Sequence, residues 1–173
     1  MSDSENKEAL LKLMRYHTTF SVADNSSMVS LDDYIKKMKQ GQSKIYFIAG
    51  QSKEHCLNNP FMEVFKDSGV PVLFLTNNVD EVCFQQIGDY KTFKFHNIEC
   101  PYEEYQKDIG DTKLSANTPS LPEDDTTSFV LWLKNELQSY VQKVTISKRL
   151  VAVPCVLYGQ VSSSMRMVMQ MME

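Results

Sequence analysis

The side chains that could supply a nucleophile, a base or a metal ligand are scattered along this 173-residue chain. His55 and Cys56 are adjacent, but consecutive helical residues point about 100° apart, so they do not form a catalytic dyad. The four cysteines show neither a CxxC pair nor a Cys/His spacing that fits zinc. We therefore expect free thiols in a reducing compartment, no metal site and no catalytic residue.

Polar groups could converge at the carboxyl ends of two expected strands, residues 44–49 and 70–76. The loop residues there are Gly50, Gln51, Ser52, Thr76, Asn77 and Asn78. The stretch GQSKEHC lacks the second glycine and the Lys-Ser/Thr pair of a phosphate-binding loop. Because these loops also offer no base and no metal-binding cluster, a stand-alone α/β enzyme with its site here is kept only as an alternative.

The end of the chain is rich in methionine, with the run MRMVMQMM. As a strand it would place methionines on one face. We favour a helix, which would bring Met165, Val168, Met169 and Met172 to one face. That face could pack on a remainder of its domain. It could also bind partners, because unbranched methionine side chains adapt to many apolar surfaces.

Trp132, like the methionine face, could serve either in packing or in binding a partner. At its helical spacing it could pack in a core or between domains, or it could be a recognition anchor. A passive adaptor that binds a partner through Trp132 and the methionine face is therefore a further alternative to an enzyme.

Composition narrows the class of protein. Hydrophobic residues make up 42% and charged residues 23% of the chain, which is typical of a globular protein. The net charge of −4 argues against nucleic-acid binding. No apolar run reaches the roughly 18 residues of a membrane span, and MSDSENKE is neither a signal nor a transit peptide. We expect no nucleic-acid and no membrane partner.

Helix and strand patterns alternate along the first hundred residues. Helices are expected over residues 5–16, 31–39, 52–69 (with a break near Pro60 and an end at Gly69) and 77–90, and strands over 44–50, 70–76 and 91–98, the last at an edge. Ser30 is the expected N-cap of the second helix. This alternation predicts an α/β fold, a small three-layer unit with a short parallel sheet.

The second part of the chain begins with an acidic stretch. Residues 99–125 hold eight acids and two lysines, a net charge of −6. We expect residues 99–126 to be a linker. The pattern then predicts an α+β segment of helix, strands and helix: a helix over 127–141 with Phe129, Leu133, Leu137 and Tyr140 on one stripe, strand-like runs over 141–150 and 151–159, and the methionine helix. The predicted division is 1–98, 99–126 and 127–173.

Several motifs in order resemble the heat shock protein 90 chaperones. SLDDYIKKMKQGQSKIYFIAG is similar to the family's middle-domain signature, preceded by the Arg-Tyr of LMRYHTT. NNPFMEVFKDSGVPVLFL and VDEVCFQQI resemble the helices and strand that follow, and VTISKRLVAVPCVL resembles the opening of the C-terminal domain. The resemblance covers nearly the whole chain. It implies the end of a middle domain over 1–98 and the start of a C-terminal domain over 127–173.

The resemblance also implies a function. Family members are homodimeric clamps driven by ATP and magnesium, with the nucleotide pocket in an N-terminal domain that this sequence lacks. This piece, expected to be monomeric and without catalysis of its own, would contribute scaffold, hinge and client-contact surface. In the family a segment near Ser162–Met172 contacts clients. On that ground we name Met165, Val168, Met169 and Met172 as candidate client-binding residues, and we add Trp132 as a candidate recognition anchor.

The expected partners are client proteins and co-chaperones. The expected location is intracellular, either mitochondrial or cytoplasmic. The lean toward the mitochondrial paralogue comes from the helix LWLKNELQSYV, which looks more like that paralogue, and from YGQVSSSMRMVM, which lacks the Gly-Trp and Met-Glu-Arg of cytosolic and endoplasmic-reticulum members.

Overall fold

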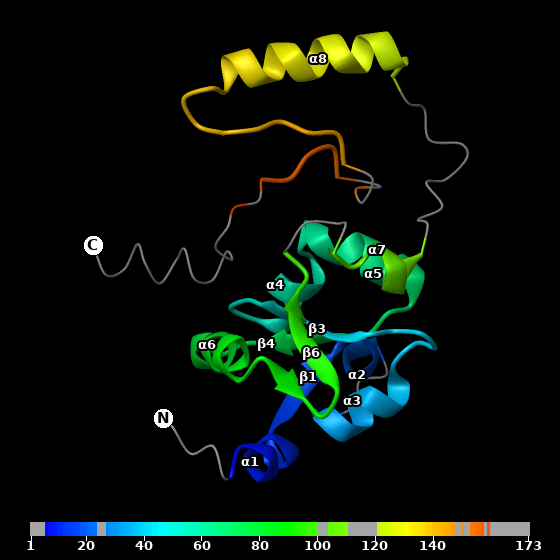
Figure 1. The fold of residues 1–173 in the computed structure, drawn as a ribbon, viewed down its shortest axis with the longest axis vertical. Helices are drawn as coiled ribbons and strands as arrows, with labels where there is room; N and C mark the ends of the chain where they lie inside the picture. Colours follow the sequence, from blue (N-terminus) through cyan, green and yellow to red (C-terminus); the bar gives the residue numbers. More distant parts are fainter. Residues whose placement is uncertain are drawn as a thin grey trace.

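The computed structural model describes residues 6–23, 27–99, 104–110, 121–147, 150, 153–157 and 159, and only the backbone of Asn78. Figure 1 shows their arrangement. The elements in chain order are α1 (Lys7–Leu13), β1 (Arg15–Thr18), α2 (Thr19–Ala23), β2 (Val29–Ser30), α3 (Leu31–Lys37), β3 (Lys44–Ala49), α4 (Lys53–Leu57), the 3-10 helix η1 (Pro60–Met62), α5 (Glu63–Ser68), β4 (Val72–Leu75), α6 (Asn78–Ile87), β5 (Asp89–Tyr90), β6 (Phe93–Asn97), α7 (Gln106–Ile109) and α8 (Glu123–Glu136).

Six strands form one mixed sheet in the order β2-β1-β4-β3-β6-β5. Its centre is parallel, because β3 pairs in parallel with both β4 and β6. β1 and β2 extend one side and β5 the other, all by antiparallel pairing. The predicted parallel sheet is thus confirmed as the centre, but three short strands were missed and β6 is not at the edge.

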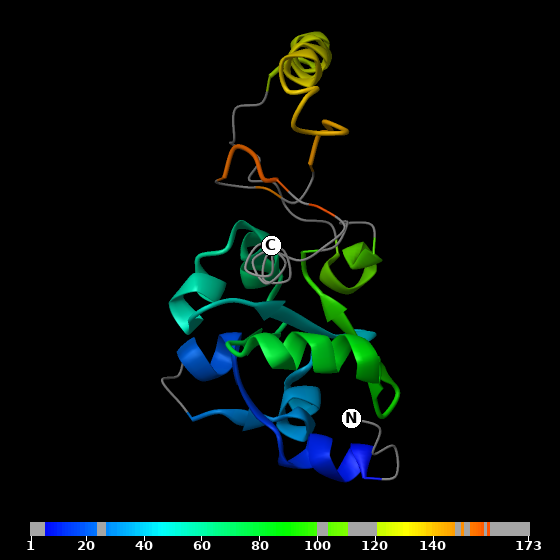
Figure 2. The same ribbon diagram turned by 90° about the vertical axis from the view of Figure 1, so that its left-hand side faces the viewer.

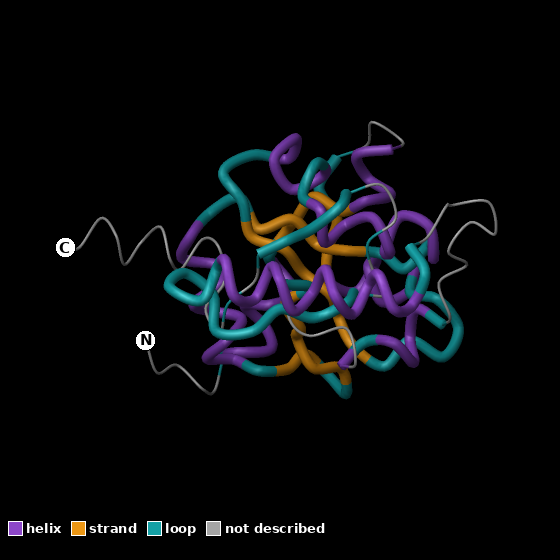
Figure 3. The backbone as a smooth tube through the Cα atoms, turned by 90° about the horizontal axis from the view of Figure 1, so that it is seen from above, coloured by secondary structure: helices purple, strands orange, loops and turns teal. Residues whose placement is uncertain are grey.

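The sheet is buried on both faces, which confirms the three-layer α/β prediction. Along β3, Tyr46 and Ile48 belong to one apolar cluster, while Ile45 and Phe47 belong to the other. This alternation follows from the two-residue period of a strand. Figure 3 shows the strands in the centre with helices on either side.

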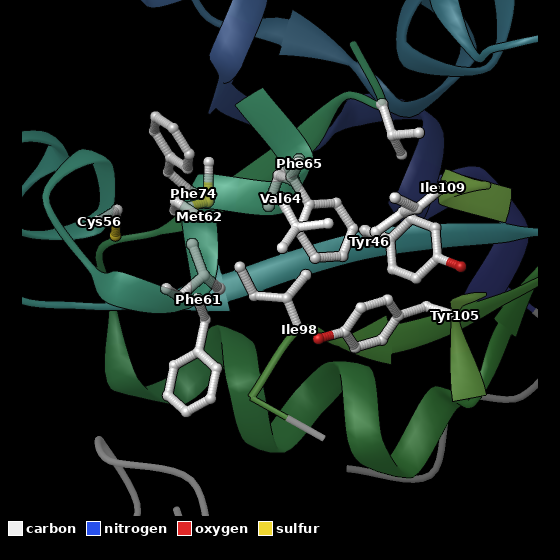
Figure 4. Packing of buried hydrophobic residues seen from close by; sticks show 13 residues of the cluster. Tyr46, Cys56, Phe61, Met62, Val64, Phe65, Phe74, Ile98, Tyr105 and Ile109 are labelled. Carbon is white, nitrogen blue, oxygen red and sulfur yellow. The ribbon is translucent and has the colours of Figure 1, made fainter. Parts of the chain in front are cut away.

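The first cluster lies under α4, η1, α5 and α7. It joins Tyr46 and Phe74 of the sheet to Phe65 of α5 and Tyr105 beside α7. Figure 4 shows the rings of Tyr46, Phe65 and Tyr105 close together, and the centroids of Phe65 and Tyr105 are 5.1 Å apart. The second cluster lies under α1, α3 and α6, and Figure 2 shows α6 lying across that part of the unit.

Local sequence signals set several helix ends as predicted. The Ser30 hydroxyl accepts a hydrogen bond from the Asp33 N–H at 3.1 Å, so Ser30 caps α3. Pro60 opens η1, and Gly69 ends α5 with a left-handed φ of 70°. The predicted helix over 5–16 is wrong in its last turn, because Met14 is extended (φ −68°, ψ 145°) and Arg15 begins β1.

Part of the predicted linker packs on the sheet. Tyr105 and Ile109 are 1% and 5% exposed and belong to the first cluster. The packed unit therefore reaches at least to Ile109, inside the range 99–126.

The predicted strands over 141–150 and 151–159 are not found among the residues that the structure describes there. Pro154 has no N–H to donate to a strand partner. Two isolated strands are also marginal in water without a further strand or helix to pack against.

Candidate functional site

Helix α8 presents exposed aromatic side chains. The rings of Phe129 and Trp132 are stacked, with centroids 5.8 Å apart and planes inclined by 28°. Their side chains are 49% and 55% exposed, and no described residue of α8 is buried. Figures 1 and 2 both show α8 apart from the sheet and its helices. Trp132 therefore packs on a neighbour in its own helix and not in a core.

Local interactions explain why the sequence is helical here. Glu123, Asp124 and Asp125 occupy the first turn, where negative charge is favourable to the helix dipole. The hydroxyls of Thr126 and Thr127 donate back to the carbonyls of Pro122 and Glu123, both at 2.9 Å. The helix begins four residues before the predicted start at residue 127, because the acids of its first turn favour the positive end of the helix dipole.

Only one of the predicted client-binding residues lies in the described part of the chain, namely Trp132. Met165, Val168, Met169 and Met172 lie outside the described residues. Sequence analysis missed the stacking of Phe129 on Trp132, although their i, i+3 spacing is readable in the sequence.

The strand-end residues of the enzyme alternative serve mainly in local structure. The Ser52 hydroxyl caps α4 by accepting from the His55 N–H at 3.1 Å. The Asn77 side chain caps α6 by accepting from the Val79 N–H at 3.1 Å. Gly50 lies against α4, because a Cβ there would be 2.8 Å from the Cys56 sulfur. These contacts fix the two turns.

The Cys56 thiol is poorly suited to nucleophilic chemistry. It is fully buried, and burial, with smaller contributions from Glu99 and Glu54, raises its pKa to about 11. Nucleophilic cysteines need a lowered pKa and some exposure.

Two buried acids lie near the same strand ends. Glu81 is 1% exposed and accepts a hydrogen bond from the Asn97 amide at 3.1 Å. Glu99 is 7% exposed, and its N–H donates to the Asn97 side-chain oxygen at 2.9 Å. Asn97 thus bridges α6 and the end of β6. Within the described ranges, no group of three or more His, Cys, Asp or Glu residues is arranged to hold a metal ion.

A polar cluster attaches α7 to β3. The Asp108 carboxylate accepts hydrogen bonds from the Ser43 N–H at 2.9 Å and from the Tyr46 hydroxyl at 2.7 Å. The Lys44 ammonium donates to the Glu104 carbonyl at 2.6 Å. Sequence analysis missed this attachment because residues 99–125 are dominated by charge. The i, i+4 apolar pair Tyr105 and Ile109 was the available signal.

In the described part of the chain, no helix is both long and apolar enough to cross a membrane.

Comparisons with known proteins agree with the motifs. A family model described as Hsp90 protein matches residues 1–173. The endoplasmin homolog of Arabidopsis thaliana is 37% identical over 157 residues, which cover 90% of this chain and 18% of that protein. The endoplasmin homolog of Catharanthus roseus is 35% identical over 175 residues, covering 98% and 20%. The chain thus spans about a fifth of the length of the curated relatives it matches.

A solved structure supports the fold. The middle domain of a Plasmodium falciparum heat shock protein superimposes with a TM-score of 0.52 at 28% identity, over 58% of this chain and 41% of that one. The similarities support an intracellular location. Both plant relatives are endoplasmin homologs, so the lean toward the mitochondrial paralogue is not supported.

Proposed function

This chain belongs to the Hsp90 protein family, and we propose that it is part of an ATP-dependent chaperone that assists the folding and maturation of client proteins. Its own contribution is scaffold, hinge and client-contact surface. The observation that carries this proposal is the exposed Phe129–Trp132 stack on a helix with no buried residue, in a chain of a chaperone family. Aromatic residues, tryptophan among them, are enriched at protein–protein interfaces and at their energetic centres.

The scaffold role rests on the α/β unit. Both faces of its sheet are covered, and α7 is fixed to β3 through Asp108. We propose the division into a middle-domain part over 1–98, a linker over 99–126 and a C-terminal part over 127–173. Helix α7, which is attached to β3, lies within the range of this linker. Two parts joined in this way would reorient as hinged bodies during a clamp cycle.

The ATPase activity is proposed for the parent protein and not for this piece. The family resemblance assigns the nucleotide pocket, with its ATP and magnesium, to an N-terminal domain, and the arginine that reaches the phosphates to sequence upstream of this chain. The parent protein would be a homodimer, while this piece would be monomeric. Clients and co-chaperones are its proposed partners, and nucleic acid and membranes are not.

Capture of an unfolded protein tests the client role. Reduced, carboxymethylated α-lactalbumin, which cannot refold, serves as the client, and chemical cross-linking reports capture. Trp132→Ala and the double variant Met165→Ser, Met169→Ser should each lower capture several-fold. Met28→Ser, which removes a methionine that is 49% exposed on the α/β unit, should not. Unchanged capture in both test variants would refute the client surface.

ATP hydrolysis separates this proposal from its two rivals. If activity appears only when the upstream sequence of the parent protein is restored, the chaperone assignment is supported. A stand-alone α/β enzyme acting at the strand ends, or a passive adaptor binding through Trp132 and the methionine face, predicts no such gain.

A further inference from the structure

Four exposed side chains share one face of α8, which we call the α8 aromatic face: Asp125, Phe129, Trp132 and Glu136. At about 100° per residue, positions four, seven and eleven after Asp125 fall within a sector of roughly 60°. The stacked aromatic pair is therefore bracketed by one carboxylate at each end of the helix. All four residues are exposed to solvent.

Charge on α8 is unevenly distributed around the helix. Lys134, its basic residue, is nine positions after Asp125 and so lies about 180° away, on the opposite side. Glu123 and Asp124 also point away from the aromatic face by this count. The aromatic face consequently presents two rings and two negative charges without a neighbouring positive charge from its own helix.

We infer that the α8 aromatic face binds a basic, apolar segment of a partner polypeptide. A lysine or arginine is attracted to the face of a tryptophan ring and to a carboxylate beside it. An apolar side chain of the same segment can cover the stacked rings. This inference rests on the proposed function and specifies the chemistry of the client that this surface prefers.

The geometry of the face sets the spacing of the positive charges. Eleven residues of helix separate Asp125 from Glu136 by about 16 Å along the axis. An extended segment rises about 3.3 Å per residue, so residues five positions apart span the same distance. The preferred segment therefore carries two basic residues five positions apart, with apolar residues between them.

A second copy of this chain fits the face poorly. A two-fold symmetric contact between two α8 helices in antiparallel orientation would place Asp125 of one copy beside Glu136 of the other at both ends. Like charges in such positions oppose association. The complementary occupant is a basic segment.

The chain contains a single tryptophan, so the fluorescence emission of Trp132 reports on this face alone. The probe is the extended peptide Lys-Ser-Phe-Leu-Ser-Lys. One control peptide replaces both lysines by glutamate, and another places the two lysines next to each other. We expect a blue shift of emission with the probe and roughly tenfold weaker binding of the glutamate peptide, with the adjacent-lysine peptide between the two.

Two double variants that each remove two acids test whether binding depends on the α8 aromatic face or only on net charge. Asp125→Asn with Glu136→Gln removes the two acids of the face, and Glu123→Gln with Asp124→Asn removes two acids outside it. The first pair should abolish the preference for the lysine peptide, and the second should retain it. Far-UV circular dichroism checks that α8 stays helical in both, since Asp124 and Asp125 both lie in its first turn.

Equal affinity for the lysine and glutamate peptides would overturn the inference. Equal losses of affinity for the lysine peptide in the two double variants would overturn it as well. A shift of emission with protein concentration alone would assign the face to self-association instead. Burial of Trp132 in a longer chain of the parent protein would assign it to packing within that protein. If the peptides fail but α-lactalbumin is still captured, the inference is wrong and the proposed function stands.

Discussion

The hydroxyl of Tyr46 donates a hydrogen bond of 2.7 Å to the carboxylate of Asp108, 62 positions later in the sequence. Tyr46 lies in the centre of the sheet and is fully buried, and Asp108 lies in α7 and is 9% exposed. The Ser43 hydroxyl also donates to Asp108, at 3.0 Å. This cluster joins the acidic stretch after β6 to the first strand of the parallel centre, and so makes α7 part of the packed unit.

Replacing Asp108 by alanine should lower the free energy of unfolding by about 2–3 kcal/mol, because it leaves the buried Tyr46 hydroxyl without its charged acceptor. Urea unfolding followed by circular dichroism measures the change. Asp67→Ala, which removes an exposed acid from α5, should change the free energy by less than about 0.5 kcal/mol. Equal effects of the two substitutions would show that the Asp108 carboxylate contributes nothing to the stability of the unit.

The parallel centre of the sheet was predictable from the sequence, because KIYFIAG and VPVLFLT are continuous apolar runs buried on both faces. The strands β1, β2 and β5 could not be predicted, since strands of two to four residues show no clear periodicity. The position of α7 was hidden by acidic composition, which is typical of linkers. The apolar side chains of Tyr105 and Ile109 become informative only once the sheet that they cover is known.

The candidate site was predictable in part. Trp132 stood out by residue type, and its exposure could not be known because helical spacing alone does not say which surface a helix covers. The bracketing of the aromatic pair by Asp125 and Glu136 depends on where the helix begins. With a start at residue 127, Asp125 fell outside the helix. The structure places that start at Glu123 and brings both acids onto one helical face.

Gly50→Ala should destabilise the unit by about 1–3 kcal/mol, because the new Cβ would lie 2.8 Å from the Cys56 sulfur and 3.1 Å from the His55 ring. Cys56→Ala removes the closer of these atoms. In a double-mutant cycle the combined variant should therefore be more stable than the sum of the two single effects predicts. Strict additivity of the two substitutions would show that the sulfur does not limit the space at Gly50.

His17→Leu should raise the free energy of unfolding by about 1 kcal/mol at pH 7.5, because the His17 Nδ1 is buried without a hydrogen-bond partner among the described residues. Burial, followed by the charge of Lys53, also lowers the pKa of His17 below its usual 6.5. The unfolded chain then binds the proton more tightly, so His17 costs stability as the pH falls below 6.5. The advantage of leucine should therefore grow between pH 7.5 and 5.5 in urea titrations, and a constant or shrinking advantage would contradict this.

The pKa of His96 should move in opposite directions when its two charged neighbours are neutralised. Burial and then the Lys44 ammonium lower this pKa, while Glu104, whose carboxylate lies 3.5 Å from Nε2, and Asp108 raise it. Glu104→Gln should therefore lower the pKa further, and Lys44→Met should raise it toward 6.5. NMR titration of the imidazole carbon-bound protons measures both shifts. Protonation of His96 is less favourable in the folded chain than in the unfolded chain. Titration of this group therefore costs no stability above pH 6.5, and the free energy of unfolding falls as the pH drops toward the pKa of His96 in the folded chain. In Glu104→Gln this loss should deepen. Shifts of the same sign in both variants would mean that His96 responds to a rearrangement of α7 and not to the charges beside it.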